Sequence, residues 1–158
     1  MLKEYFYIQL STWGLLIPLE HTAGVLTLNK AQICPIPGIP PAILGVVNQR
    51  GKLLWVLELS DLLGLDQEAK IIPSYNLTLV VLTASENTTD ERSRQVGCVV
   101  SVPKEIVVLD SLQFQPVPAS LNHSFLSGVV EIEKSLVYVL NVNAVFTALA
   151  NLDILVTA

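Results

Sequence analysis

The chain has 158 residues, the size of one ordinary domain or of two closely joined halves of about 70 residues each. Hydrophobic residues make up 51% of it and charged residues 15%, against roughly 25% in an average soluble domain, so apolar side chains should fill a core and extend onto contact surfaces. The formal net charge of -5, from 14 acidic and 9 basic residues, leaves no cationic excess for phosphates and argues against a nucleic-acid partner.

Neither a membrane span nor a secretory leader is expected. Charged residues, Pro, Asn or Gly interrupt every apolar stretch well before the roughly 18 to 20 residues that a bilayer requires. The first residues also lack the basic start and cleavage site of a signal peptide, so we expect the chain to be cytoplasmic. Cys34 and Cys98 are its two cysteines and lack C-x-x-C spacing, so we expect free thiols, no disulfide and no metal site.

Short β-branched and aromatic runs predict strands along most of the chain. Residues 5–10 and 13–19 should form a hairpin around Ser11-Thr12. A second hairpin should join residues 46–48 to 53–57 through a four-residue turn, 49–52, in which a glycine supplies the positive φ. Short strands at this density favour barrels over one wide sheet. Further strands are expected at residues 77–83, 96–102, 105–109, 128–132 and 136–140.

Two single helical turns are predicted on either side of the second hairpin. The first covers residues 42–44, begins after two prolines and ends at Gly45. The second covers residues 61–63, is capped by Ser60 and ends at a glycine.

A longer helix is predicted near the C-terminus. Asn141 or Asn143 can cap an apolar run over residues 144–149 whose spacing suits packing against a core. The polar segment 84–95 lacks large apolar side chains and should be a solvated loop.

The sequence offers little catalytic chemistry. Nucleophile-elbow, dinucleotide-loop and P-loop motifs are absent from it. His21 and His123 are its two imidazoles, and their spacing favours no triad with a particular serine and aspartate. Glu131 and Glu133 should share one strand face and meet solvent rather than form an acid–base pair. We therefore expect no catalytic residues and no cofactor.

The most distinctive block is residues 33–59, which read ICPIPGIPPAILGVVNQRGKLLWVLEL. A proline-rich approach leads into a Gly-x-x-Asn-x-Arg-Gly hairpin and then into an apolar strand that ends in Glu-Leu. This block closely resembles the CheW-like family of chemotaxis coupling proteins. The resemblance extends over residues 5–149 through further matches in the same order: Trp13-Gly14, Pro18-Leu19-Glu20-His21, Val25-Leu26, Val96-Gly97-Cys98-Val99-Val100 and Phe125-Leu126-Ser127-Gly128-Val129.

The resemblance implies an all-β fold of two packed five-stranded SH3-like barrels, with a few short helices and a C-terminal helix. Residues 1–158 would form a single CheW-like domain of two intertwined barrel subdomains. The implied function is that of a non-enzymatic adaptor. One surface would bind the regulatory domain of a CheA-type histidine kinase, and a groove between the barrels would receive the cytoplasmic tip of a methyl-accepting chemoreceptor. Recruitment to membrane-associated receptor arrays and weak self-association are also expected.

Six residues are implied in partner binding: Arg50, Asn48, Gly51, Gly45, Thr22 and Val25. The planar guanidinium of Arg50, on an exposed turn, could hold a receptor carboxylate through two hydrogen bonds, which a lysine cannot do. The alternative is that Arg50 only binds nearby carbonyls and holds the hairpin. Asn48 and Gly51 should shape the turn.

The other three candidates have equally ordinary explanations. Gly45 matches a family position implicated in docking, where it would allow a close backbone approach, although it could instead end the helical turn. Thr22 and Val25 lie on the strand that follows Pro18, which family members use for partner contact, yet both could be plain barrel surface.

Three positions depart from the family pattern: Gly24 replaces a common Glu, Ser60 a common Arg and Ser101 a common Asp. Such changes should retune partner choice more than affinity. We therefore expect a dedicated receptor–kinase pair, for example in twitching or phototaxis through type IV pili. The competing function is a small-molecule-binding regulatory β-barrel module, since an apolar groove could also hold a ligand. A hydrolase would need His21 or His123 for turnover.

Overall fold

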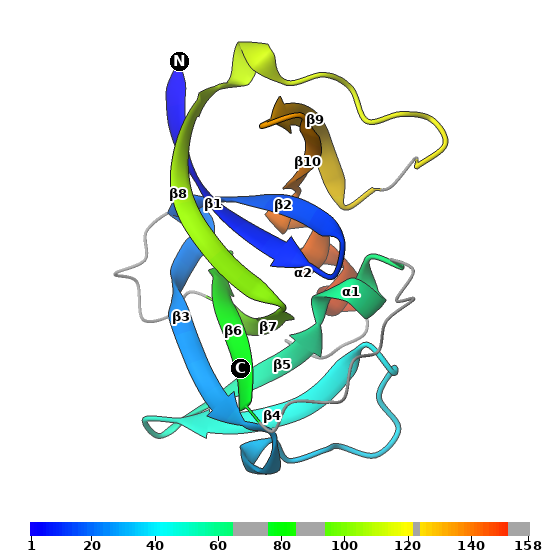
Figure 1. Ribbon diagram of the computed structural model, residues 1–158. Coiled ribbons are helices and arrows are strands. Elements are labelled where there is room, and N and C mark those ends of the chain that lie inside the picture. Colours follow the sequence, from blue (N-terminus) through cyan, green and yellow to red (C-terminus); the bar gives the residue numbers. More distant parts are fainter. Residues whose placement is uncertain (65–75, 85–93, 122–123, 152–158) are drawn as a thin grey trace.

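The computed structural model describes residues 1–64, 76–84, 94–121 and 124–151. Its strands form two five-stranded sheets, as the resemblance implied (Figure 1). The first sheet, in the upper part of the view, contains β1 (Leu2–Leu10), β2 (Trp13–Pro18), β8 (Val102–Asp110), β9 (Leu126–Ile132) and β10 (Ser135–Leu140). The second contains β3 (Thr22–Asn29), β4 (Ile43–Gln49), β5 (Lys52–Glu58), β6 (Asn76–Thr83) and β7 (Gln95–Val100). The spatial orders are β8-β1-β2-β10-β9 and β3-β6-β7-β5-β4.

Both predicted hairpins are present, but the second turn is shorter than expected. In the first, Leu10 pairs with Trp13 across Ser11-Thr12. In the second, β4 and β5 pair as far as Gln49 and Lys52, so the turn is only Arg50-Gly51. The four-residue prediction was wrong because both turn residues have positive φ, 53° and 82°, which matches the twist of the paired strands and lets pairing reach the tip.

A third hairpin, β9–β10, has the same construction. Ile132 pairs with Ser135, and the turn residues Glu133 and Lys134 have φ of 49° and 69°. Glu133 therefore lies in the turn and does not share a strand face with Glu131, which corrects the sequence-based expectation.

The two predicted single turns differ from the structure. Ile43 and Leu44 belong to β4, because cross-strand pairing with β5 offers their backbone groups better partners than one helical turn. Gly45 consequently ends no helix and lies at a β-bulge. The second turn is α1 (Leu59–Leu62), which has Glu58 at its N-cap. Ser60 is buried inside the helix and does not cap it.

The C-terminal helix, α2 (Val142–Asn151), agrees with prediction. Asn141 supplies the cap, since its Oδ1 accepts the Ala144 N–H at 3.1 Å. Phe146 and Leu149 are buried in the core shared by both sheets. Among the described residues, no helix is long and apolar enough to span a bilayer.

The chain contains an internal structural repeat. The series β3, η2 (Lys30–Gln32), β4, β5 and α1 is followed later by β8, η3 (Ser111–Gln113), β9, β10 and α2. Short bridges also correspond, because Cys34 pairs with Val46 as Gln115 pairs with Val129. The two sheets thus have equivalent strand orders, with the β3 and β8 edges in matching positions.

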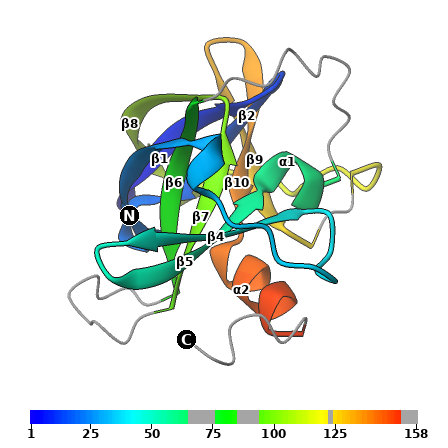
Figure 2. The same ribbon diagram turned by 90° about the horizontal axis from the view of Figure 1, so that it is seen from below.

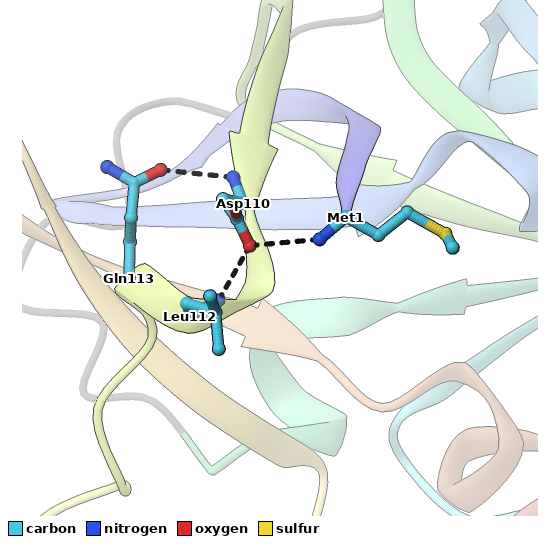
Figure 3. Close-up of polar contacts among 4 residues, drawn as sticks. All are labelled: Met1, Asp110, Leu112 and Gln113. Carbon is cyan, nitrogen blue, oxygen red and sulfur yellow. Dashed lines mark hydrogen bonds and ion pairs between the residues drawn. The ribbon is translucent and has the colours of Figure 1, made fainter.

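Each repeat opens its 3-10 helix with a capping box. Asp110 Oδ1 accepts the Leu112 N–H at 3.0 Å, and the Asp110 N–H donates to Gln113 Oε1 at 3.0 Å (Figure 3). The Met1 ammonium also lies 3.3 Å from Asp110 Oδ1. Asn29 performs the same capping function for η2.

Three apolar clusters hold these elements together. Each sheet has its own cluster, and the repeat relates them position by position: Val47, Leu54 and Val56 correspond to Val130, Val137 and Val139. The third cluster combines β1 and β2 with β6, β7 and α2, so the two sheets share a core. Each fully buried aliphatic side chain contributes about 1.5–3 kcal/mol.

Candidate functional site

Arg50 lies at the tip of the β4–β5 hairpin and is exposed. Asn48 Oδ1 accepts the Gly51 N–H at 2.9 Å and so closes the turn. Within the described residues, the Arg50 guanidinium has no hydrogen-bond or ion-pair partner. The hairpin is therefore held by Asn48, and the arginine side chain remains available to an external acceptor.

Gly45 is buried, at the opposite end of β4 from Arg50. Its φ is +144°, and a β-carbon there would collide with the carbonyl group of Cys34 and come within 2.9 Å of the Pro35 Cα. Two hydrogen bonds hold this crossing, since Cys34 N–H donates to Val46 O at 2.7 Å and Val46 N–H donates to Cys34 O at 3.0 Å. Because Gly45 has no β-carbon, the backbone at Cys34 and Pro35 can lie this close to β4.

Thr22 and Val25 lie on β3, which forms an edge of the second sheet. Val25 is 44% exposed and presents an apolar side chain to solvent. Thr22 is half-buried, and its hydroxyl donates to Pro18 O at 3.2 Å. Val25 therefore offers apolar contact surface, whereas the Thr22 hydroxyl is engaged in a hydrogen bond that fixes the start of β3.

All six candidates belong to the second sheet but do not form one cluster. Asn48, Arg50 and Gly51 lie together at the β4–β5 tip. Gly45 lies at the other end of β4, and Thr22 and Val25 lie on the opposite edge strand, β3. Figure 2 shows the β4–β5 hairpin extending to one side of the molecule.

Sequence reasoning missed the apolar surface of β8, the edge strand of the first sheet. Ile106 and Val108 are 55% and 56% exposed. Ile106 lies four residues before the helix cap Asp110, just as Val25 lies four residues before the helix cap Asn29. The two exposed side chains therefore occupy equivalent positions in the two repeats. The repeated pattern Gln-x-x-Pro-x-Pro, at residues 32–37 and 113–118, is the signal that could have revealed this relationship.

A small recess opens beside Gly45. It has a volume of about 150 Å³ and is lined by Lys30, Ile33, Pro35 and Leu44. Clefts that hold drug-sized ligands have roughly 300–1,000 Å³. A recess of this size is better suited to one side chain of a partner than to a whole ligand.

The histidines and cysteines are the remaining candidates for catalytic or metal-binding chemistry. His21 is buried, and its Nδ1 lies 3.0 Å from the Thr83 carbonyl oxygen, whereas His123 lies outside the described residues. Cys34 is an exposed free thiol and Cys98 a buried one, and burial raises the pKa of Cys98. No group of three metal-ligating side chains occurs in the described part of the chain.

Ser101, one of the departures from the family pattern, lies where the chain passes from the second sheet back to the first. Its Oγ accepts the Ser11 N–H at 2.9 Å, and its N–H donates to Gln9 O at 2.9 Å. The strand predicted over residues 96–102 accordingly ends at Val100, because Ser101 is needed for this connection.

Comparisons with known proteins agree with the fold. The family model described as CheW-like domain matches residues 4–150. The chemotaxis protein CheW of Rhizobium meliloti is 28% identical over 115 residues, covering 71% of this chain and 68% of that protein. The probable chemotaxis protein CheW of Rhizobium etli is 25% identical over 115 residues, with the same coverage.

A solved structure shows the same architecture. The scaffolding protein TtCheW from Thermoanaerobacter tengcongensis superposes with a TM-score of 0.73 at 19% identity, covering 89% of this chain and 90% of that one. With the family model spanning nearly all of the described residues, the conclusion is direct: this chain belongs to the CheW-like domain family.

Proposed function

We propose that this chain is a non-enzymatic adaptor that couples methyl-accepting chemoreceptors to a CheA-type histidine kinase. The CheW family consists of chemotaxis scaffold proteins, so membership supports the general role. The observation that carries the specific proposal is the exposed Arg50 guanidinium, which lacks an internal partner among the described residues while Asn48 holds the turn.

The receptor contact combines a charge with apolar surface. A receptor tip is an amphipathic helix pair, and its apolar stripe can pack on exposed aliphatic side chains such as Val25 on β3 and Ile106 on β8. Arg50 then holds a receptor carboxylate through its two-pronged guanidinium. Such charge contacts set register and specificity.

Gly45 acts indirectly in this proposal. It cannot reach a partner with a side chain, and its role is to let the segment around Cys34 and Pro35 lie against β4. Pro35 of that segment lines the recess together with Lys30, Ile33 and Leu44, and the recess offers a largely apolar place for one partner side chain. Docking of the kinase regulatory domain therefore depends on Gly45 through the shape of this surface.

The pathway served is a dedicated one, for example type IV pilus twitching or phototaxis. Of the three departures from the family pattern, Ser60 is buried and Ser101 is engaged at the sheet crossing. Gly24 differs, since nothing lies within 4 Å of where its β-carbon would be, and it adjoins the exposed Val25. Loss of a carboxylate there changes the surface beside the receptor contact. Full recovery of swimming chemotaxis by this chain in a flagellar pathway would contradict this assignment.

The adaptor acts in the cytoplasm, at the membrane-associated receptor arrays. The test is binding of Arg50→Ala to a receptor cytoplasmic fragment and, separately, to a kinase regulatory domain. Affinity for the receptor should fall about tenfold, equivalent to about 1.4 kcal/mol, with an unchanged thermal midpoint. Lys52→Ala, which removes an exposed charge on the same hairpin, is the matched control and should have a smaller effect. Equal effects of the two substitutions, or a large loss of thermal stability in Arg50→Ala, would contradict the proposal.

A further inference from the structure

Two short connections carry the chain between the two sheets. The first is η1 (Leu19–His21), which leads from β2 in the upper sheet of Figure 1 into β3 in the lower one. The second lies at Ser101, between β7 and β8. Both connections are attached to β1. Near its start, Lys3 Nζ lies 3.3 Å from Glu20 Oε1, and near its end the Gln9 carbonyl accepts the Ser101 N–H at 2.9 Å.

Two consecutive residues of η1 are held by different sheets. Glu20 pairs with Lys3 of the first sheet. His21 Nδ1 lies 3.0 Å from the carbonyl oxygen of Thr83, at the end of β6 in the second sheet. Because a carbonyl oxygen can only accept, Nδ1 carries the hydrogen and donates it. The ion pair is exposed and contributes little, whereas His21 is only 9% exposed and its hydrogen bond is shielded from water. His21 is therefore the stronger attachment.

The His21 hydrogen bond acts where the backbone pairing of β3 with β6 stops. Thr22 pairs with Leu82, and the register shifts between Thr22 and Gly24. Thr83 is the next residue of β6, so the imidazole N–H bonds to it beyond the last backbone pair on this side. A bulged strand bends. The side chain of His21 consequently sets the direction in which η1 leaves the second sheet.

The relative placement of the two sheets matters because the apolar side chains that face the receptor belong to both of them. Val25 lies on β3, at the edge of the second sheet, and Ile106 lies on β8, at the edge of the first. The shared apolar core holds the sheets together, but hydrophobic contact has no preferred direction. Hydrogen bonds depend on angle, so the polar attachments of the two connections fix how one sheet is turned against the other.

We propose that His21 is a positioning residue of this adaptor. Its hydrogen bond to Thr83 fixes the η1 connection and, through it, the spacing between Val25 and Ile106 that the helix pair of a receptor tip meets. His21 is buried and touches no partner itself. The consequence for receptor binding rests on the proposed function. The recess proposed for the kinase contact is lined by η2 and β4 and the residues between them, all on the side of the second sheet, so kinase binding does not depend on this spacing.

Three substitutions of one residue test the hydrogen bond. His21→Asn keeps an N–H donor at the δ position, His21→Gln moves the same amide one methylene group further, and His21→Leu removes the donor. Affinity for a receptor cytoplasmic fragment should fall about threefold to tenfold in the Leu and Gln variants, as loss of one hydrogen bond predicts, and stay near the wild-type value in the Asn variant. Affinity for a kinase regulatory domain should not change in any of them.

A matched control removes a side-chain hydrogen bond that lies within one sheet. Ser127 Oγ donates to Val139 O at 3.5 Å, and both residues belong to the first sheet. Ser127→Ala should therefore leave receptor and kinase affinity unchanged. Thermal midpoints of all variants are measured alongside.

The placement of the sheets can be measured without any partner. Spin labels at Thr27→Cys on β3 and Glu105→Cys on β8, two exposed positions, report the distance between the sheets by double electron–electron resonance. The background carries Cys34→Ser, because Cys34 is exposed and Cys98 is buried. The distance distribution should be broader or shifted in the Leu and Gln variants and like the wild type in the Asn variant. Labels at Thr27→Cys and Lys52→Cys, both in the second sheet, should give one distribution in all variants.

An unchanged distance between β3 and β8 in His21→Leu would overturn the proposal, even if its thermal midpoint fell, because the bond would then serve stability alone. Equal losses of receptor and kinase affinity, or failure of His21→Asn to restore the wild-type distance, would overturn it too. A wild-type chain that does not bind the receptor fragment would contradict the proposed function instead, and the distance distributions would still decide whether His21 sets the placement of the sheets.

Discussion

The carbonyl group of Cys34 occupies the space in which residue 45 would carry its β-carbon, so Gly45 lies directly beneath the strand bridge that Cys34 forms with Val46. Two backbone hydrogen bonds fix this crossing and determine where the proline-rich segment leaves β4. The recess beside it depends on the same contact, because Pro35 and Leu44 are among its lining residues.

Gly45→Ala should destabilise the protein by about 2–4 kcal/mol, because a backbone collision adds to an unfavourable φ. Gly38→Ala is the control: its φ is +83° but nothing lies within 4 Å of the added carbon. That change should cost only about 1–2 kcal/mol. Urea unfolding of both variants measures the difference, and equal losses would contradict a role for the Cys34 contact.

Asn48→Ala should lower both stability and receptor affinity. The substitution removes the acceptor of the Gly51 N–H, which costs about 1 kcal/mol, and frees the turn that orients Arg50. Asn48→Asp keeps an acceptor oxygen and should retain most of the stability. Thermal unfolding and receptor-fragment binding are measured for both variants. Full receptor affinity in a destabilised Asn48→Ala chain would show that the turn does not position Arg50.

Lys134→Gly should stabilise the fold by about 0.5–1 kcal/mol, because Lys134 holds a φ of 69° that glycine adopts without a β-carbon penalty. Gly51→Ala, the reverse change at the equivalent turn position, should destabilise by a similar amount. Chemical denaturation gives both values. A destabilised Lys134→Gly chain would indicate that the lysine side chain makes a contact that outweighs backbone strain.

Asp110 should contribute a pH-dependent part of the stability. Its pKa lies below the ordinary value of 3.8, first because the Leu112 N–H donates to the carboxylate and then because of the Met1 ammonium. A carboxyl whose pKa is lowered in the folded state stabilises the fold above its ordinary pKa, and this contribution disappears as the pH falls through the lowered value. Asp110→Asn keeps the cap, as Asn29 does in the other repeat, but does not titrate.

The thermal midpoint of the wild-type chain should therefore exceed that of Asp110→Asn near neutral pH. This difference should narrow between about pH 5 and pH 2. Thermal scans across that range measure it, and a constant difference would mean that the carboxylate charge contributes nothing to folding.

Local sequence patterns were sufficient to predict much of this architecture. Alternating apolar residues identified most of the strands, and the two-residue spacing at Ser11-Thr12 identified the first hairpin, because burial of one strand face imposes a period of two on the sequence. Asn141 could be placed as a cap from its position before an apolar helical run, since the donors that it satisfies lie within the same turn. The family block around Arg50 pointed to an exposed hairpin tip.

The features that local patterns did not predict depend on contacts between residues far apart in the sequence. From the sequence, Gly45 was interpreted as a helix stop, because no neighbouring residue reveals that the Cys34 backbone lies against it. Ser60 was interpreted as a helix cap, because its burial depends on strands far away in the sequence. Ser101 ends β7 only because two residues far away in the chain bond to it: the Ser11 N–H donates to its Oγ, and the Gln9 carbonyl accepts its N–H. Likewise, the equivalence of the β4–β5 and β9–β10 hairpins becomes visible only once both sheets are formed, because backbone pairing and burial are satisfied by residues that a local pattern does not specify.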